Sequence, residues 1–145
     1  QILYLQIKME TKEAIITLLK ASSCVSESLC QTLKPFGVSL QQFNVLRILR
    51  GQKGNAANLS TVQERMVNKM SNTTRLIDKL IDKNFVKRSI CKENRRKIEL
   101  FITEKGEALL KEIDPVVDEC QEKMIQKLEP NGKNNLVKLL KQLIK

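Results

Sequence analysis

The sequence predicts a mainly α-helical (α+β) fold, in which a winged helix-turn-helix with a two-stranded β wing is flanked by long N- and C-terminal helices. Apolar residues recur at the three-and-four spacing of a helix over most of the chain. The segment 97–102 instead alternates with period two, and a polar, basic stretch separates it from an earlier apolar run. With 145 residues, of which 41% are hydrophobic, the chain is predicted to form a single domain over 1–145.

Two helices are predicted in the first third of the chain. The first extends from Glu10 to Leu33 and ends before Pro35. Its apolar positions are Ile15, Leu18, Leu19, Val25, Leu29 and Leu33. The second begins at Ser39, where a Ser and a Gln three residues later form a capping-box pattern, and Gly51 is expected to end it. Residues 52–58 are predicted to form a loop.

Two shorter helices follow in the order expected of a helix-turn-helix. Ser60 and Gln63 again fit a capping box, which predicts the start of the third helix. The fourth is predicted to begin at Ser71, and its apolar positions are Leu76, Ile77, Leu80 and Ile81. Asn84 lies where this helix must end, and Asn adopts the left-handed conformation more easily than other residues apart from Gly.

A basic β-hairpin is predicted next, with strands at 85–91 and 97–102 and a polar tip at 92–96. The stretch 83–97 contains one acidic residue, Glu93, and seven basic ones: Lys83, Lys87, Arg88, Lys92, Arg95, Arg96 and Lys97. A solvated charged hairpin is the simplest explanation. However, cationic side chains at a protruding tip can also enter a narrow DNA minor groove, where the electrostatic potential is strongly negative.

The C-terminal part is predicted to contain two more helices. Thr103 caps the fifth, whose apolar stripe continues to Leu128, and Pro115 is expected to bend or split it. The Pro-Asn-Gly turn at 130–132 precedes the last helix. Because both termini carry more apolar residues than one chain can cover, the terminal helices of two chains are expected to interleave in a two-fold homodimer.

Charge indicates the class of partner. The chain has 26 Lys and Arg against 16 Asp and Glu, a net charge of +10, and therefore attracts polyanions. Only 3% of its residues are aromatic, which argues against RNA or single-stranded DNA held by base stacking. Double-stranded DNA is the expected partner.

The absence of histidine from the sequence limits the chemistry available. Without it, a Ser or Cys nucleophile has no ordinary base and zinc lacks its usual nitrogen ligand, so no enzyme activity, metal or other cofactor is expected. The four cysteines are expected to be buried or half-buried thiols, with redox sensing by Cys24 or Cys30 as the alternative. No apolar run reaches the length of about 18 residues that a membrane helix needs, and no signal peptide is evident, so a cytoplasmic protein is expected.

Candidate DNA contacts fall in three places. The fourth helix starts with small polar residues and continues with two cations, a combination that lets a helix end approach phosphates and base edges. For Ser71, capping the helix is as good an explanation as contact. The candidates are Ser60 and Thr61 at the third helix, Ser71, Asn72, Thr73, Thr74, Arg75 and Lys79 at the fourth, and Lys92, Arg95 and Arg96 at the hairpin tip.

Several of these segments resemble the multiple-antibiotic-resistance regulator (MarR) family of bacterial winged-helix transcription factors. The matching stretches are SLQQFNVL at 39–46, TRLIDKL at 74–80, NRR at 94–96 and ITEKG at 102–106. The resemblance implies dimerisation helices at 1–36 and 107–145 around a DNA-binding part at 37–106. It also implies that Arg96 enters the minor groove while Arg95 and Lys92 contact phosphates. The chain departs from the family at Asn94, where an Asp is usual, and Asn offers only a weaker, neutral hydrogen bond.

The expected function follows from the motifs and the resemblance together. We expect a sequence-specific, homodimeric repressor that binds a pseudo-palindromic operator and is released by a small amphipathic or phenolic effector or by oxidation. Tyr4, Phe36 and Phe43 could line an effector pocket, but core or interface packing is the favoured explanation for them. The alternative is a non-specific or architectural nucleic-acid-binding protein, for which the net charge alone would suffice.

Overall fold

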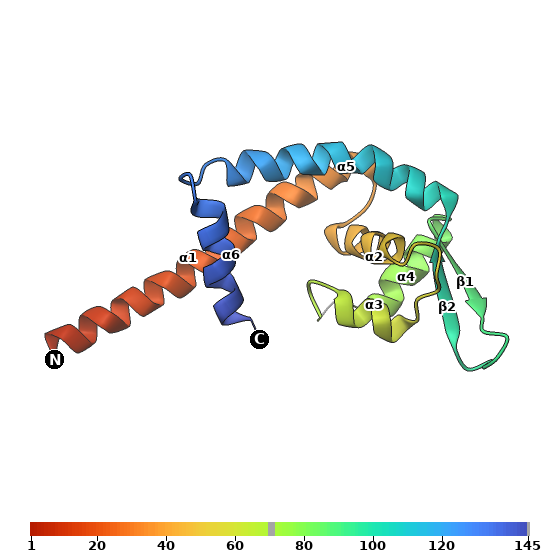
Figure 1. The fold of residues 1–145 in the computed structure, drawn as a ribbon, viewed down its shortest axis with the longest axis horizontal. Coiled ribbons are helices and arrows are strands. Elements are labelled where there is room, and N and C mark those ends of the chain that lie inside the picture. Colours follow the sequence, from red (N-terminus) through yellow and green to blue (C-terminus); the bar gives the residue numbers. More distant parts are fainter. Residues whose placement is uncertain (70–71, 145) are drawn as a thin grey trace.

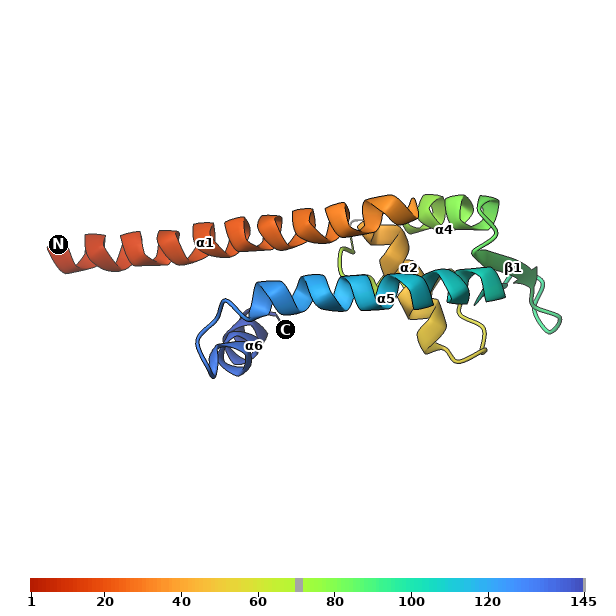
Figure 2. The same ribbon diagram turned by 90° about the horizontal axis from the view of Figure 1, so that it is seen from above.

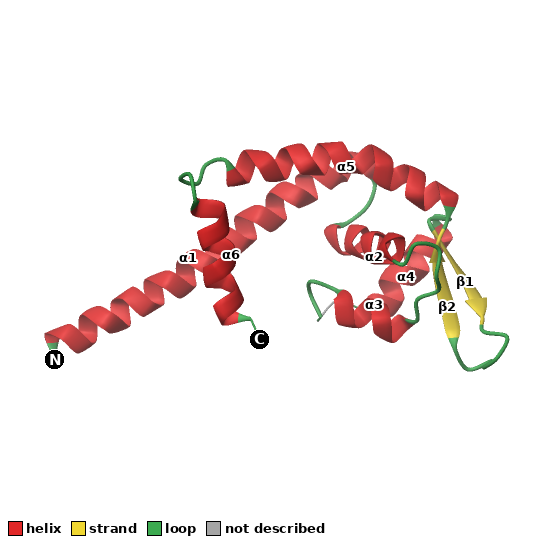
Figure 3. Ribbon diagram, in the orientation of Figure 1, coloured by secondary structure: helices red, strands yellow, loops and turns green. Residues whose placement is uncertain are grey.

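The computed structural model describes residues 1–69 and 72–144 and has the helical architecture with a small sheet that the sequence predicts (Figures 1 and 3). In chain order the elements are α1 (Ile2–Leu33), the 3₁₀ turn η1 (Lys34–Phe36), α2 (Leu40–Gly51), α3 (Leu59–Arg65), α4 (Thr73–Asp82), β1 (Val86–Ile90), β2 (Ile98–Ile102), α5 (Glu104–Ile125) and α6 (Gly132–Leu143). None of these helices is long and apolar enough to span a membrane.

The hydrophobic core occupies only the middle of the chain. Every buried apolar side chain among the described residues lies between Leu33 and Val117. The core takes side chains from the end of α1, from α2, α3, α4 and the sheet, and from α5 as far as Val117. The N-terminal half of α1 projects beyond the rest of the chain, and α6 has no buried residue (Figures 1 and 2).

The first helix is longer than its pattern predicts. It begins at Ile2, not near Glu10, and forms a single rod that packs against α5 along its C-terminal half. The early residues Ile2, Leu3, Leu5 and Ile7 are apolar, but no other element of the chain buries them and they do not form a regular helical stripe. Periodicity alone therefore predicts a helix start that is too late.

The capping box at the start of α2 is confirmed. The Ser39 Oγ accepts a hydrogen bond from the Gln42 N–H at 3.1 Å, and the Gln42 Oε1 accepts one from the Ser39 N–H at 3.0 Å. The predicted end of this helix at Gly51 is confirmed, although the left-handed conformations that follow belong to Lys53 and Gly54 and not to Gly51 itself.

Asparagine caps both helices of the helix-turn-helix. The Asn58 Oδ1 accepts hydrogen bonds from the Thr61 N–H at 2.8 Å and from the Thr61 hydroxyl at 3.0 Å, so α3 begins at Leu59 and the capping box predicted at Ser60 is wrong. The Asn72 Oδ1 accepts one from the Arg75 N–H at 3.2 Å and starts α4. Ser71, the predicted cap, lies outside the described residues.

The sheet is an antiparallel hairpin attached to the core at its middle. Val86 pairs with Ile102 and Ile90 with Ile98, which confirms the predicted pairing of the two segments. A bridge attaches the hairpin to the loop before α3, where Ala57 and Leu100 exchange backbone hydrogen bonds of 3.0 and 2.7 Å. The buried Leu100 therefore anchors the hairpin to the core.

A tight corner joins the end of α4, the base of the hairpin and the start of α5. Asn84 has the expected left-handed conformation, with φ of 64°. The Thr103 hydroxyl donates to the Asn84 carbonyl at 2.7 Å and accepts from the Gly106 N–H at 3.0 Å, so Thr103 caps α5 as predicted. Gly106 lies directly against the Phe85 carbonyl.

Replacing Gly106 by alanine is expected to lower the free energy of unfolding by about 1–3 kcal/mol, the usual cost of overpacking. An added Cβ would clash with the Phe85 carbonyl oxygen and lie 2.8 Å from the Ile102 Cγ1, and the first of these is backbone that cannot move aside cheaply. Urea denaturation followed by circular dichroism measures the change. Gly51→Ala is the matched control, because nothing lies within 4 Å of the Cβ it adds; equal stability of the two variants would contradict the close approach at Gly106.

Of the two outcomes expected at Pro115, a bend or a split of the fifth helix, the split does not occur. α5 is continuous through Pro115, curves in Figure 1 and ends at Ile125, so Leu128 lies beyond it. Pro115 has no N–H to donate to the carbonyl four residues earlier, and the curvature of the helix is the expected response to that loss.

The cysteines are more exposed than predicted. Cys24 and Cys30 are exposed on α1, while Cys91 and Cys120 are half-buried. The expectation of four buried or half-buried thiols is therefore wrong for the two cysteines of α1 in the single chain, because that face of the helix has no covering element in the chain described.

Candidate nucleic-acid interface

The N-terminal half of α4 borders an open groove. Asn72, Arg75 and Lys79 line one wall, and Ser39 and Gln41 of the first turn of α2 line the other. The groove has a volume of about 510 Å³, and the side chains of Arg75 and Lys79 are exposed. Two cations and a helix N-terminus that share one open groove form a surface suited to an anionic ligand.

One predicted contact on α4 is corrected. Thr73 is only 5% exposed and faces the core, so its side chain is not available to a partner in this structure. The reason is periodicity, because Thr73 occupies the same face of the helix as Ile77 and Leu80, which are also buried. Thr74, the next residue, is exposed, and the predicted contact at Ser71 lies outside the described residues.

The start of α3 presents two of the predicted residues differently. Ser60 is exposed in the first turn of the helix. Thr61 is half-buried, and its hydroxyl donates to the Asn58 Oδ1 at 3.0 Å. Ser60 is therefore freer than Thr61 to contact a phosphate, and Asn58, which sequence reasoning missed, holds this turn in place.

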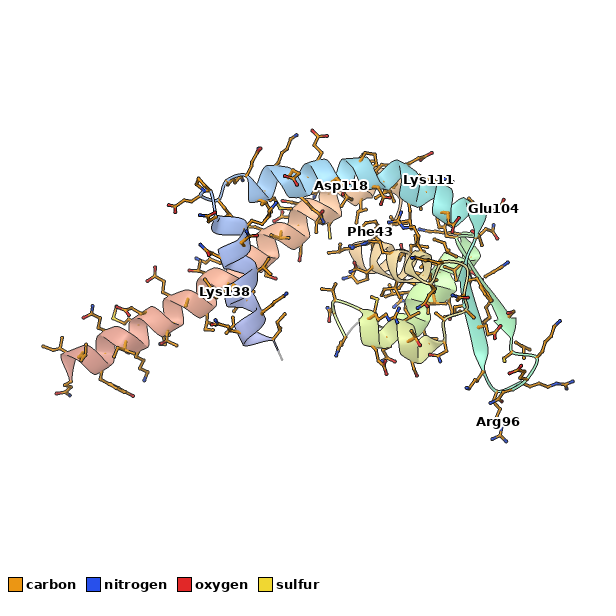
Figure 4. The ribbon with its side chains drawn as sticks, in the orientation of Figure 1. Phe43, Arg96, Glu104, Lys111, Asp118 and Lys138 are labelled. Atoms are coloured by element: carbon orange, nitrogen blue, oxygen red, sulfur yellow. The ribbon has the colours of Figure 1, made fainter. Side chains whose placement is uncertain are left out.

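The tip of the hairpin carries the three predicted cations, and all three are exposed. Figure 4 shows Arg96 at the free end of the hairpin, with its side chain pointing away from the body of the molecule. The Asn94 Oδ1 accepts a hydrogen bond from the Arg96 N–H at 3.1 Å, and the Asn94 carbonyl accepts one from the Lys97 N–H at 2.9 Å. Asn94 thus braces the turn that presents Arg96 through neutral hydrogen bonds.

An ion pair connects the hairpin to α4. The Arg88 guanidinium of β1 lies 3.8 Å from the Asp78 carboxylate of α4, and about half of each side chain is exposed. Both residues border a small apolar slot of about 60 Å³ that Thr74 and Leu100 also line. The hairpin and the polar start of α4 therefore belong to one connected surface.

Sequence reasoning missed the contribution of α2 to this surface. Ser39 and Gln41 lie beside Arg75 because the first turn of α2 packs near α4, a tertiary contact that no local pattern reveals. Asn58 had a detectable signal, since Asn is as good a cap as Ser and stands two residues before Ser60. The capping-box pattern at Ser60 outweighed this signal.

The sequence profile of the MarR family matches residues 38–98, the stretch from α2 to the start of β2. A solved MarR transcription factor from Planctomyces limnophilus is 30% identical over 91% of this chain and 96% of its own, with a TM-score of 0.73. The transcriptional repressor MprA of Escherichia coli is 26% identical over 112 residues, 77% of this chain. The chain spans 64% of the length of this curated relative.

Two further structures share the fold at lower identity. Escherichia coli MarR, a mutant solved in complex with operator DNA, is 19% identical over 94% of this chain and 96% of its own, with a TM-score of 0.83. A study of how 6-hydroxynicotinic acid regulates DNA binding by BpsR of Bordetella bronchiseptica gives a structure 23% identical over 92% of this chain and 99% of its own, with a TM-score of 0.81.

Proposed function

The chain belongs to the MarR family, and from this we propose that it is a sequence-specific, DNA-binding transcriptional regulator that acts as a homodimeric repressor on a pseudo-palindromic operator. The observation that carries the proposal is the set of cations that two adjacent elements expose. They are Arg75 and Lys79 on α4 and Arg95 and Arg96 at the hairpin tip, and the Arg88–Asp78 ion pair connects the two elements. The operator complex solved for Escherichia coli MarR, which has the same fold, supports a DNA partner.

In each chain, two elements of the winged helix-turn-helix make most of the DNA contacts: α4 and the β-hairpin. The start of α4 enters the major groove, where Asn72, Thr74 and Arg75 approach base edges and Lys79 contacts a phosphate. The hairpin extends along the duplex, so that Arg96 enters the minor groove while Arg95 and Lys92 contact phosphates. Ser60 contacts the backbone from the start of α3.

The exposed apolar side chains of the terminal helices support a homodimer. A single chain exposes large hydrophobic residues on both α1 and α6, more than a stable monomer usually leaves uncovered. They are Ile2, Leu3, Leu5, Ile7, Ile15, Ile16 and Leu19 on α1 and Val137, Leu139 and Leu143 on α6, all at least 47% exposed. A second copy of the same chain would cover both sets and set the two α4 helices about 34 Å apart, one turn of DNA.

Release from DNA is the regulated step of the proposal. A ligand releases the operator only if it binds better to a dimer whose α4 spacing no longer fits the two half-sites. The 6-hydroxynicotinic acid response of BpsR supports a small aromatic acid or phenol as effector. Oxidation is the second route, because the thiols of Cys24 and Cys30 are exposed on α1 in the single chain.

Selection from a random duplex library tests sequence specificity. We expect the selected duplexes to contain two half-sites in inverted orientation and to compete at least about a thousandfold better than random DNA at physiological salt, as specific binders do. Competition titrations at fixed ionic strength measure this ratio, since salt dependence alone would not separate the two kinds of binding. A flat response across the library would instead indicate the alternative, a non-specific or architectural DNA-binding protein.

A further inference from the structure

A bidentate ion pair joins the DNA-binding part to α5. The Arg50 Nη1 donates to one Asp114 carboxylate oxygen at 2.6 Å, and the Nη2 donates to the other at 3.2 Å. Arg50 is in the last turn of α2, and Asp114 is in the middle of α5, 64 residues later. Fork-to-fork geometry of this kind fixes the relative orientation of the two helices as well as their distance.

The position of this pair distinguishes it from the other ion pairs. Arg88–Asp78 lies within the DNA-binding part, and Lys123–Glu119 joins consecutive turns of α5. Over the ranges 1–69 and 72–144, Arg50–Asp114 is the one ion pair that crosses from the DNA-binding part to the helices flanking it. It borders a cavity of about 270 Å³ between α2 and α5, beneath the part of α5 that Lys111 and Asp118 mark in Figure 4.

The residue after Asp114 is Pro115, which makes α5 easiest to bend next to the ion pair. Pro115 has no N–H to donate to the carbonyl four residues earlier, so α5 is weakest in bending at this point. Before the proline, Leu110 and Ile113 are fully buried in the core of the DNA-binding part, whereas the described residues of α5 beyond Val117 are half-buried or exposed. Arg50 therefore holds α5 directly before the proline, near the end of the segment of α5 that belongs to the core, which closes at Val117.

α2 connects this contact to the DNA-reading helix. It packs against both α5 and α4, and Leu46 and Leu49, which are almost completely buried, lie in the same core cluster as Ile77 and Leu80 of α4. Because a packed core transmits a small rotation without absorbing it, a change in the angle between α2 and α5 moves α4 as well.

We infer that Arg50 and Asp114 are positioning residues that fix the angle between each DNA-binding part and the dimerisation helices, and so set the separation of the two α4 helices. The inference rests on the proposed dimeric, operator-binding function. The pair touches no DNA in this scheme, and its effect is on which half-site spacing the dimer fits. An ion pair with more than a third of each side chain exposed contributes little to overall stability, so its removal should leave the fold intact.

The test uses a series of duplexes in which the selected half-sites are kept and the distance between them is changed one base pair at a time. The full-length wild-type protein is expected to show a sharp optimum. Arg50→Gln and Asp114→Asn are expected to lose about tenfold or more at that optimum and less than about threefold at neighbouring spacings, so that the profile flattens or shifts; tenfold lies within the usual range of coupling between sites. Thermal unfolding of each variant checks that the fold is retained.

Three further variants make the result interpretable. The exchange of both residues, Arg50→Asp with Asp114→Arg, should restore the wild-type optimum at least in part, and Glu112→Gln, which removes the same charge from an exposed position two residues away, should leave the profile unchanged. If Arg50→Gln fails to fold, Arg50→Lys keeps the charge without the bidentate geometry and should flatten the profile. An equal loss at every spacing, or an unchanged optimum, would overturn the positioning role. A wild-type protein without any spacing optimum would instead overturn the proposed function.

Discussion

Replacing Arg96 by alanine is expected to weaken operator binding by at least about thirtyfold while leaving the fold intact. A specific arginine contact is worth about 1–3 kcal/mol, and a dimer loses two of them, so about 2 kcal/mol is the lower bound. The Arg96 side chain points away from the body at the end of the hairpin. Its backbone is held by Asn94 through a hydrogen bond that the substitution retains. Fluorescence anisotropy with the selected duplex at fixed salt measures the loss.

The groove that Arg96 enters can be identified by varying the flanking sequence. A·T-rich flanks narrow the minor groove and strengthen its negative potential, whereas G·C-rich flanks do not. Arg96→Ala should therefore cost more affinity on A·T-rich than on G·C-rich flanks, whereas Lys92→Ala, a phosphate contact in this scheme, should cost the same on both. Lys111→Ala on α5 is the control for lost charge far from the hairpin. An unchanged affinity, or a loss independent of the flanks, would refute the minor-groove role of Arg96.

Replacing Leu139 by glutamate is expected to dissociate the dimer. Leu139 is 60% exposed in the single chain, so the substitution should cost the isolated fold little. In a dimer that covers α6, the same carboxylate would be buried without a partner, and we expect a cost of at least about 3 kcal/mol, more than a hundredfold in the dimer dissociation constant. Sedimentation equilibrium measures that constant, and operator affinity should fall to that of a single half-site.

The neighbouring residue provides the matched control for this experiment. Lys138, labelled in Figure 4, precedes Leu139 on α6 and does not belong to its set of exposed apolar residues. Lys138→Glu introduces the same carboxylate on the polar side of the helix and should leave the dimer intact. If both variants remain dimeric, the apolar face of α6 does not form the interface, and dimerisation must be sought along α1 alone.

The sequence predicts this fold well where local patterns determine structure. The capping box of Ser39, the left-handed Asn84 and the Thr103 cap are set by residues within a few positions of each other, and all three are confirmed. Errors occur where a choice depends on packing. Asn58 and Ser60 are equally good caps by sequence, and only the burial of Val62 and the rest of the core decides between them. The continuity of α5 through Pro115 likewise depends on core contacts before the proline.

At the candidate interface, the sequence predicts which charged residues are exposed better than it predicts how they are arranged in space. Exposure of Arg75, Lys79, Arg95 and Arg96 follows from their type, since arginine and lysine are seldom buried. Thr73 was placed wrongly because its polarity outweighed its position in the buried stripe of α4, a signal that was present in the sequence. Other parts of the surface could not be found in this way. The groove between α2 and α4 and the Arg50–Asp114 pair exist only through contacts between segments distant in the chain.

The way the hairpin is attached makes its length an adjustable property. The hairpin is secured at its middle by the Ala57–Leu100 bridge and at its base by the Thr103 corner, whereas the backbone hydrogen bonds beyond Cys91 stay within the turn itself. Residues can therefore be added to or removed from the tip in pairs, which preserves the alternation of faces, without disturbing α4 or α5. Related proteins that differ in the length of this loop would reach different distances along the duplex while keeping the same α4. For the same reason, the loop could be exchanged in an engineered protein without changing α4.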